Sequence, residues 1–155
     1  MAHKHRKGAA SILTLPVKLT STVPTNDITN GVLCALVSNK LVPVDKFPLD
    51  TNEATTQTAF AAAFAGLAAG NSYAASTDAR QLEIAVLDDG DVEFDVASAV
   101  YHVGDYIGPS LTGSFLTNAM EAVASKALAV AVVSEEPTGT VTKVVARLIN
   151  TPCKR

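Results

Sequence analysis

Short apolar stretches separated by turn-forming residues run through most of this chain, and this spacing limits the folds that it can form. Turn residues recur about every eight to twelve positions, between about eight or nine stretches that have the length of β-strands. Alternation is clear in residues 12–20, where apolar residues from Leu13 to Leu19 occupy every second position. Pro16 cannot donate a backbone hydrogen bond, which places that strand at a sheet edge or at a subunit boundary. The pattern predicts a mainly β protein, an antiparallel sandwich or barrel.

Two turns predict β-hairpins. A polar turn at residues 38–40 separates two apolar stretches, and the Asp-Gly dipeptide within residues 88–90 separates residues 81–87 from residues 91–96. Further short strands are expected at residues 99–103, 105–107, 127–133 and 141–149. In the last of these, Lys143 and Arg147 mark the outer face.

One segment has the composition of an α-helix. Residues 59–69 are rich in alanine, and large apolar side chains recur within them at spacings of four and three. These side chains are Phe60, Phe64 and Leu67. Asp50 and Glu53 have the spacing of a capping box, and residues 70–71 supply a stop, so we expect one inserted helix at about residues 51–69. Its opposite face is mostly alanine, which either close packing against a neighbour or helix propensity alone explains.

The N-terminal segment is basic, and no acidic residue occurs before Asp27. We expect residues 1–10 to form a basic arm and residues 11–155 to form a single β-rich domain. The arm lacks the aromatic residues that stack on single-stranded nucleic acid, so an acidic protein surface is the expected partner and nucleic acid is not. The partner-binding residues expected in the arm are His3, Lys4, His5, Arg6 and Lys7.

An acidic stripe is the second candidate interface. In residues 91–96 acidic and apolar residues alternate, which predicts that Val92, Phe94 and Val96 point inward and the acids outward. The acids are Asp91, Glu93 and Asp95. Their spacing does not match a calcium-binding EF-hand loop. They are complementary in charge to the basic arm, which can reach them in a neighbouring copy of the chain.

Motifs for catalysis or cofactor binding do not occur in the sequence. The nearest approach to a phosphate-binding loop, residues 104–110, has no lysine. His102 and Asp105 are the one pair that suits general-base chemistry, and no Gly-x-Ser-x-Gly element supplies a nucleophile. Cys34 and Cys153 are too few for a disulfide framework and too far apart for a metal pair, so we expect free thiols. We therefore expect no enzyme activity, no cofactor and no metal.

Composition indicates a chain that makes protein contacts. Hydrophobic residues are 48% of the sequence, charged residues only 17%, and the formal net charge is −3. This supports a sizeable core and leaves a surface with few charges to desolvate. No apolar run approaches the ~18–20 residues of a membrane span, and residues 12–20 are too interrupted for a signal-peptide core. We expect a non-membrane protein made in the cytoplasm.

Two segments resemble the C-terminal half of tailed-phage capsid cement (head decoration) proteins. Residues 100–109 read Val-Tyr-His-Val-Gly-Asp-Tyr-Ile-Gly-Pro, and residues 124–133 read Ala-Ser-Lys-Ala-Leu-Ala-Val-Ala-Val-Val before a basic closing strand. Residues 30–36, followed by residues 41–44, are similar to an earlier hairpin of that family. The predicted helix and the basic arm depart from the shorter family members.

The resemblance implies a β-rich structural protein of the virion. It implies a capsid decoration subunit, commonly a homotrimer, that binds the major capsid protein lattice and stabilises the head through many weak contacts, without catalysis. Three alternatives remain open at this point: a tail-tube or head-completion subunit, a small hydrolase that uses His102 and Asp105, and a DNA-packaging accessory protein.

Overall fold

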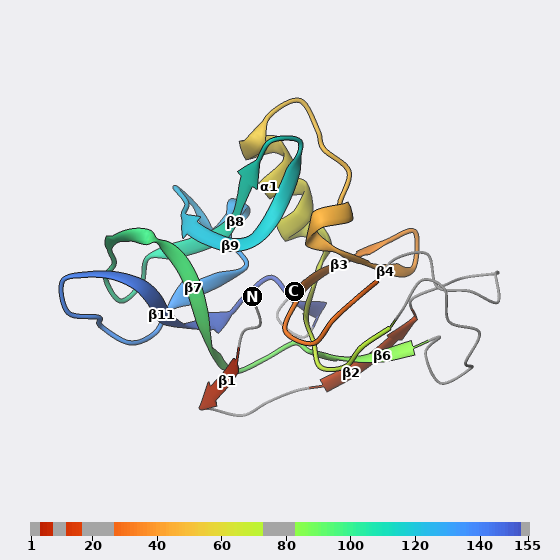
Figure 1. Ribbon diagram of the computed structural model, residues 1–155, viewed down its shortest axis with the longest axis horizontal. Coiled ribbons are helices and arrows are strands. Elements are labelled where there is room, and N and C mark those ends of the chain that lie inside the picture. The colour runs from red at the N-terminus through yellow and green to blue at the C-terminus, as the bar shows by residue number, and fades with distance from the viewer. Residues whose placement is uncertain (1–3, 8–11, 17–26, 73–82, 153–155) are drawn as a thin grey trace.

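The computed structural model describes residues 4–7, 12–16, 27–72 and 83–152, and these form two curled β-sheets and one α-helix (Figure 1). The six-stranded sheet, in the order β1-β7-β11-β10-β8-β9, contains β1 (Lys4–Lys7), β7 (Asp91–Val100), β8 (Tyr106–Thr112), β9 (Phe115–Ala122), β10 (Ala131–Val133) and β11 (Thr140–Leu148). The five-stranded sheet, in the order β2-β6-β5-β3-β4, contains β2 (Ile12–Pro16), β3 (Leu33–Val37), β4 (Lys40–Pro43), β5 (Phe64–Ala68) and β6 (Glu83–Leu87). The helical elements are α1 (Glu53–Ala63) and the short 3-10 turns η1 (Val44–Lys46) and η3 (Lys126–Leu128). The predicted fold class, mainly β with one inserted helix, is confirmed.

Five strands of the larger sheet close into a ring. Neighbouring strands from β7 through β11, β10 and β8 to β9 pair antiparallel, and β9 returns to β7 through a parallel pairing of Val96 with Met120. Val92 and Phe94 are fully buried in the core and Val96 is nearly so, as their alternation predicted. The ring closes without β1, which pairs with β7 at residues 91–93.

Alternate residues of the smaller sheet contribute to two different cores. One set packs with the residues inside the ring and includes Leu33, Ala35, Phe64 and Leu67. The other set forms a second core together with Ile28, and its members are Cys34, Leu41, Ala65, Ala68, Ile84 and Val86. Edge strand β2 also approaches edge strand β4, so this sheet curls around the second core. The edge position of β2 agrees with Pro16, which has no N–H to donate to a further strand.

One of the two predicted hairpins forms, and the other does not. β3 and β4 pair with Val37 opposite Lys40, and the two turn residues, Ser38 and Asn39, have φ values of 49° and 61°. Two successive positive φ angles are typical of a type I′ turn, which suits the twist of a hairpin. The Asp-Gly turn at residues 88–90 instead carries the chain from β6 in one sheet to β7 in the other, with Gly90 at φ 115°.

The helix α1, Glu53–Ala63, is shorter than the predicted residues 51–69, and it begins later and ends earlier than expected. Its N-cap is Asn52, whose Oδ1 accepts a hydrogen bond from the Thr55 N–H while the Asn52 N–H donates to Thr55 Oγ1. It ends at Ala63, and the last third of the predicted helix forms β5. A buried extended segment there supplies backbone partners to both β3 and β6, which a helix cannot do.

Other sequence predictions are corrected in detail. Residues 127–133 form η3 and the short strand β10 in place of one strand, and β9 was not predicted at all. β11 matches its prediction. The described part of the arm is strand β1, and the rest of the predicted residues 1–10, including His3, lies outside the described residues. Within the described segments, no helix is long and apolar enough to cross a membrane.

Candidate interaction surfaces

The structure brings the basic arm and the acidic stripe together within one chain. β1 runs antiparallel to β7 with Lys4 opposite Glu93, His5 opposite Val92 and Lys7 opposite Asp91. The register shifts between His5 and Lys7, so that Arg6 is the extra residue of a bulge. The sequence predicted both segments as partner-binding surfaces and predicted that the arm can reach the stripe of a neighbouring copy, whereas here the two pair within one chain. Whether either one contacts a partner stays a prediction.

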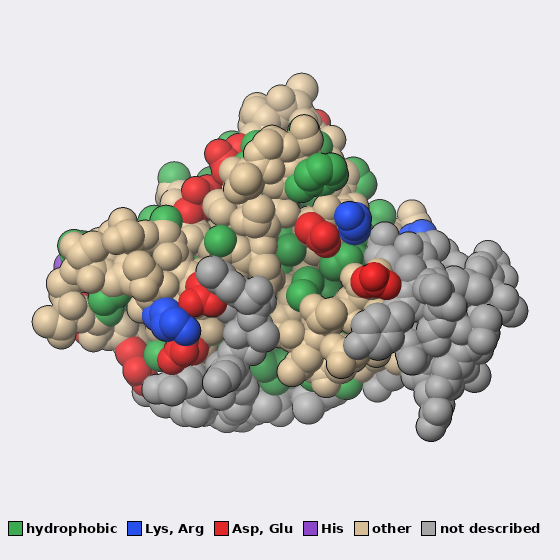
Figure 2. All heavy atoms as spheres, in the orientation of Figure 1, with side chains coloured by type: hydrophobic (Ala, Val, Ile, Leu, Met, Phe, Trp, Pro, Cys, Tyr) green, Lys and Arg blue, Asp and Glu red, His purple; other side chains and the backbone are tan. Residues whose placement is uncertain are grey.

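The acidic residues of β7 also pair with β11 on the other side. Lys143 Nζ lies 3.4 Å from a carboxylate oxygen of Glu93 and 3.4 Å from one of Asp95. The hydrogen bond to Asp95 and then the charge of that carboxylate raise the pKa of Lys143. Figure 2 shows acidic side chains gathered around a basic one over β7 and β11. The stripe is thus largely neutralised by cations of the same chain.

Asp91 departs from the prediction that all three acids point to solvent. Its side chain is only 1% exposed, and both of its carboxylate oxygens accept hydrogen bonds from the Arg147 guanidinium, at 3.0 and 3.2 Å. The alternating pattern identified the face of the strand correctly, but it did not show that Arg147 covers this position. Asp91 is therefore a paired, buried charge, while Glu93 and Asp95 are only partly covered.

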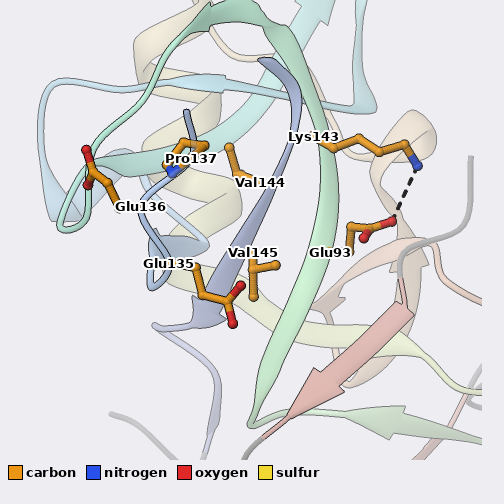
Figure 3. Close-up of a pocket in the computed structure, with 7 residues that line it drawn as sticks. All are labelled: Glu93, Glu135, Glu136, Pro137, Lys143, Val144 and Val145. Carbon is orange, nitrogen blue, oxygen red and sulfur yellow. Dashed lines mark hydrogen bonds and ion pairs between the residues drawn. The ribbon is translucent and has the colours of Figure 1, made fainter. Parts of the chain in front are cut away.

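A small cavity of about 130 Å³ adjoins the pairing of β7 with β11. Figure 3 shows its lining residues, with Lys143 reaching Glu93 on one side and the loop that carries Glu135 and Glu136 on the other. Glu136 points away from Glu135 in this view. Among the described residues, no group of three or more His, Cys, Asp and Glu side chains is arranged to hold a metal ion. The cavity is an acidic surface hollow beside an ion-pair network.

His102 lies in the turn between β7 and β8, where Glu136 holds it. His102 Nδ1 is 2.8 Å from Glu136 Oε1, and the Val103 N–H donates to Glu136 Oε2 at 2.8 Å. The hydrogen bond that the imidazole donates to Glu136, and then the charge of that carboxylate, raise the pKa of His102. The hydrogen bond from Val103, followed by that from His102, lowers the pKa of Glu136. One carboxylate therefore joins this turn to the loop before β11.

The contacts of His102 do not support the hydrolase alternative. Asp105 Oδ2 accepts a hydrogen bond from the His102 backbone N–H at 2.7 Å, and it is Glu136 that binds the imidazole. The side chain of His102 is 68% exposed, so it lies on the surface of the turn. Cys34 is a free thiol buried in the second core, where burial strongly raises its pKa, and Cys153 lies outside the described residues.

An apolar groove runs along the outer face of α1. The α1 side contributes small side chains, and the opposite wall comes from η3 and its neighbours. The space is about 580 Å³ and is lined by Asp50, Ala54, Thr55, Thr58, Ala59, Ala62, Ser125, Ala127 and Leu128. A second hollow of about 320 Å³ continues it from Ala127 toward Asn150. We call both together the α1 groove.

Sequence reasoning identified only one wall of this groove. The alanine-rich face of the helix was visible in the composition, but Ala127 and Leu128 were assigned to a strand. η3 is held by Asn150, whose Nδ2 donates to the carbonyl oxygens of Lys126 and Ala129 at 2.8 and 2.9 Å. That contact spans more than twenty residues of sequence, so no local signal predicts it.

The helix itself is fixed to the ring by polar contacts that the sequence did not reveal. Gln57 Nε2 donates to the Pro109 carbonyl oxygen at 3.0 Å and to Glu121 Oε1 at 2.7 Å. Glu53 Oε1 accepts the Leu111 N–H at 2.7 Å. Partial burial raises the pKa of Glu121, and the nearby Glu53 raises it further. These contacts attach one side of the α1 groove to β8 and β9.

Four large apolar side chains remain exposed in the described part of the chain. They are Leu49, Val100, Val103 and Phe115. Val100 and Val103 flank the turn that Glu136 holds, and Phe115 opens β9, with Lys46 Nζ 6.0 Å from its ring centroid.

Comparison with known proteins finds no matching family model, no matching curated sequence and no matching solved structure. The fold and the chemistry of these surfaces are therefore the basis for a functional proposal.

Proposed function

We propose that this chain is a structural subunit of a phage virion, a capsid cement protein that binds the major capsid protein lattice and stabilises the head. The α1 groove is the observation that carries the proposal. It is wide and lined mainly by alanine and threonine, and Asp50 is the one charged residue in its lining. A partner can therefore approach its backbone closely while desolvating little charge. No catalytic step is part of this function.

The resemblance to the cement family supports the same conclusion. Its two segments, residues 100–109 and 124–133, are separated in sequence, and they lie side by side because β10 pairs with β8. The registered pairs are Ala131 with Ile107 and Val132 with Tyr106. The second segment also carries Ala127 and Leu128 of the α1 groove. The resembling residues therefore include part of the surface that we propose to contact the capsid.

Co-sedimentation with empty heads tests the proposal directly. The heads are assembled from the major capsid protein of the same virus, in expanded form and without decoration. We expect the purified protein to sediment with them up to a saturating stoichiometry and to delay their disruption by heat. A protein that stays in the supernatant at every concentration contradicts the proposed function.

Variants of the groove sharpen this test. Ala59→Glu and Ala62→Glu place charge on the exposed face of α1 while leaving its buried residues intact. We expect both to weaken binding to heads, because a carboxylate in the interface must lose its hydration. The matched control is Thr142→Glu, which adds the same charge on an exposed position of β11. Equal binding of all three variants removes the groove from the contact.

Deletion of residues 1–8 tests the arm. The ring of five strands closes without β1, so we expect the fold to persist and attachment to heads to weaken. Circular dichroism checks the fold and co-sedimentation checks the attachment.

We also expect the subunit to be a homotrimer, which light scattering distinguishes from the rings of six or twelve typical of tail-tube and head-completion subunits.

A further inference from the structure

We propose that β1 is an exchangeable strand: Lys4–Lys7 of one copy of this chain pairs with β7 of a second copy at residues 91–93, in place of the same pairing within one chain. The partner is another copy of this chain, and the contact is an antiparallel strand pairing between a basic strand and an acidic one. The proposal does not depend on binding to a capsid.

The position of β1 at the end of its sheet makes exchange feasible. Within the described residues β1 pairs with β7 alone, and the ring of β7, β11, β10, β8 and β9 is closed by the pairing of Val96 with Met120. Removing β1 therefore breaks no pairing between the other strands. The β7 edge that it leaves, at residues 91–93, presents backbone groups that only another strand can pair fully.

The connection of β1 to the rest of the chain also permits exchange. Residues 8–11, with the sequence Gly-Ala-Ala-Ser, join it to β2, which belongs to the other sheet and is itself an edge strand. β1 thus forms no hairpin with the strand that follows it in sequence.

Charge complementarity favours a basic strand at the β7 edge, as β1 of a second copy provides. The register sets Lys4 opposite Glu93 and Lys7 opposite Asp91, and the bulge at Arg6 is what brings both lysines opposite acidic residues. Oppositely charged residues on facing positions of antiparallel strands stabilise the pairing. The β7 segment carries three acids, and β11 supplies two cations to them. A basic strand therefore suits this edge better than a neutral or acidic one.

The same contacts form within one chain or between two, so local concentration decides between them. At low concentration the closed form is favoured, because exchange requires two molecules to associate. Where copies are held close together, exchange links neighbours without any new interface chemistry. A basic strand from a different protein is the competing occupant of the β7 edge. Cross-linking between two tagged copies of this chain distinguishes a second copy from such a protein.

Cysteine cross-linking between two different variants tests the exchange. Lys4→Cys and Glu93→Cys are placed in separate chains, each also carrying Cys153→Ser, and the two chains are co-expressed with different C-terminal tags. A disulfide requires facing Cα atoms at distances that antiparallel partners provide. Because neither chain contains both new cysteines, a bond between them forms only when β1 of one lies against β7 of the other.

We expect non-reducing electrophoresis to show a shift from the 16.0 kDa chain to a species of twice that mass that contains both tags. The matched control pairs Lys4→Cys with Lys46→Cys, an exposed lysine on η1 that has no register partner in β1. We expect the control to remain at the mass of one chain. Deletion of residues 1–8 from the wild-type chain should also lower the average mass measured by light scattering at high concentration.

Two results overturn the proposal. A single chain that carries both Lys4→Cys and Glu93→Cys serves as a double variant. One result that overturns the proposal is a mixture of the two single variants that cross-links no more than the control, while the double variant forms the disulfide within its own chain. The other is a mixture and a double variant that both fail to cross-link, which shows that β1 does not face β7. Failure to bind heads, with cross-linking intact, contradicts only the proposed function.

Discussion

Arg147 on β11 and Asp91 on β7 form a two-point ion pair in which the acid is buried and the base is half exposed. The Nε and Nη2 atoms of Arg147 lie 3.0 and 3.2 Å from the two carboxylate oxygens of Asp91. The side chain of Asp91 is 1% exposed and that of Arg147 is 53% exposed. The partly exposed guanidinium therefore shields the buried Asp91 carboxylate from water.

Replacing Arg147 should destabilise the protein more than replacing Lys143, the other cation of β11 that pairs with β7. We expect Arg147→Met to lower the free energy of unfolding by about 1–3 kcal/mol, because Asp91 is left buried without its charged partner. Lys143→Met should have a smaller effect, since Glu93 and Asp95 remain in contact with water. Urea denaturation of both variants measures the difference, and equal losses would show that Asp91 is solvated.

Phe64 should contribute strongly to stability although it does not belong to the helix. It is fully buried at the start of β5 and lies 5.9 Å from the Phe60 ring, centroid to centroid. We expect Phe64→Ala to cost about 3–5 kcal/mol through lost burial and the cavity that it leaves. Phe115→Ala is the control of the same chemistry, and its exposed ring predicts a loss below about 1 kcal/mol. Thermal unfolding of both variants compares them.

Gly66 should tolerate no side chain. Its φ is +133°, and a Cβ there would collide with the Leu87 carbonyl oxygen and lie 2.8 Å from Val86 Cγ1. We expect Gly66→Ala to destabilise by about 1–3 kcal/mol from overpacking, with backbone strain in addition. Gly70→Ala meets no atom within 4 Å and should leave the unfolding midpoint nearly unchanged. A Gly66→Ala protein as stable as Gly70→Ala would argue against the β5–β6 pairing.

The contact between His102 and Glu136 should depend on pH in a defined window. A raised pKa of His102 means that its contribution is complete below the ordinary value of 6.5 and is lost as pH rises through the raised pKa. A lowered pKa of Glu136 means that its contribution is complete above the ordinary value of 4.5 and is lost as pH falls through the lowered pKa. The turn should therefore be held most firmly between about pH 4.5 and 6.5.

An NMR titration of the imidazole checks this window. We expect the pKa of His102 to lie above 6.5 in the wild-type protein and to fall in Glu136→Gln, which keeps the hydrogen-bonding shape and removes the charge. His102→Ala identifies the resonance. A titration curve that Glu136→Gln does not move would show that the two side chains are apart in solution.

Glu121→Gln should stabilise the protein at neutral pH. A carboxyl whose pKa is raised by partial burial and by Glu53 loses stability as pH rises through its ordinary value of 4.5 toward the raised pKa. The amide keeps an oxygen for Gln57 and carries no charge. We expect a gain of a few tenths to about 1 kcal/mol after solvent screening. Glu83→Gln, at an exposed position of β6, is the control and should show no gain.

Local patterns predicted the elements whose partners are close in sequence or whose two faces differ clearly. The β3–β4 hairpin follows from the polar turn at residues 38–40 between two apolar stretches, and β11 follows from an apolar stretch with Lys143 and Arg147 on its outer face. The inward residues of β7, from Val92 to Val96, follow from period-two alternation. The low charge density and the alanine-rich helix face pointed toward protein contacts, and one wall of the α1 groove lies on that face.

Contacts between distant segments decided the rest. Residues 64–68 have helix-forming composition, yet they form β5 because both β3 and β6 offer backbone partners to an extended chain. The Asp-Gly turn at residues 88–90 reverses the chain, but the sheets on either side determine that β6 and β7 do not pair with each other.

The charged surface shows the same division. The residue types and their alternation, which are properties of the sequence, determined that one strand carries acids and the arm carries bases. The tertiary structure alone decided that Arg147 covers Asp91, that β1 lies opposite residues 91–93, and that η3 completes the α1 groove. The physical reason is that propensity and alternation act between neighbours along the chain, whereas burial and ion pairing depend on which distant residues the fold brings within contact distance.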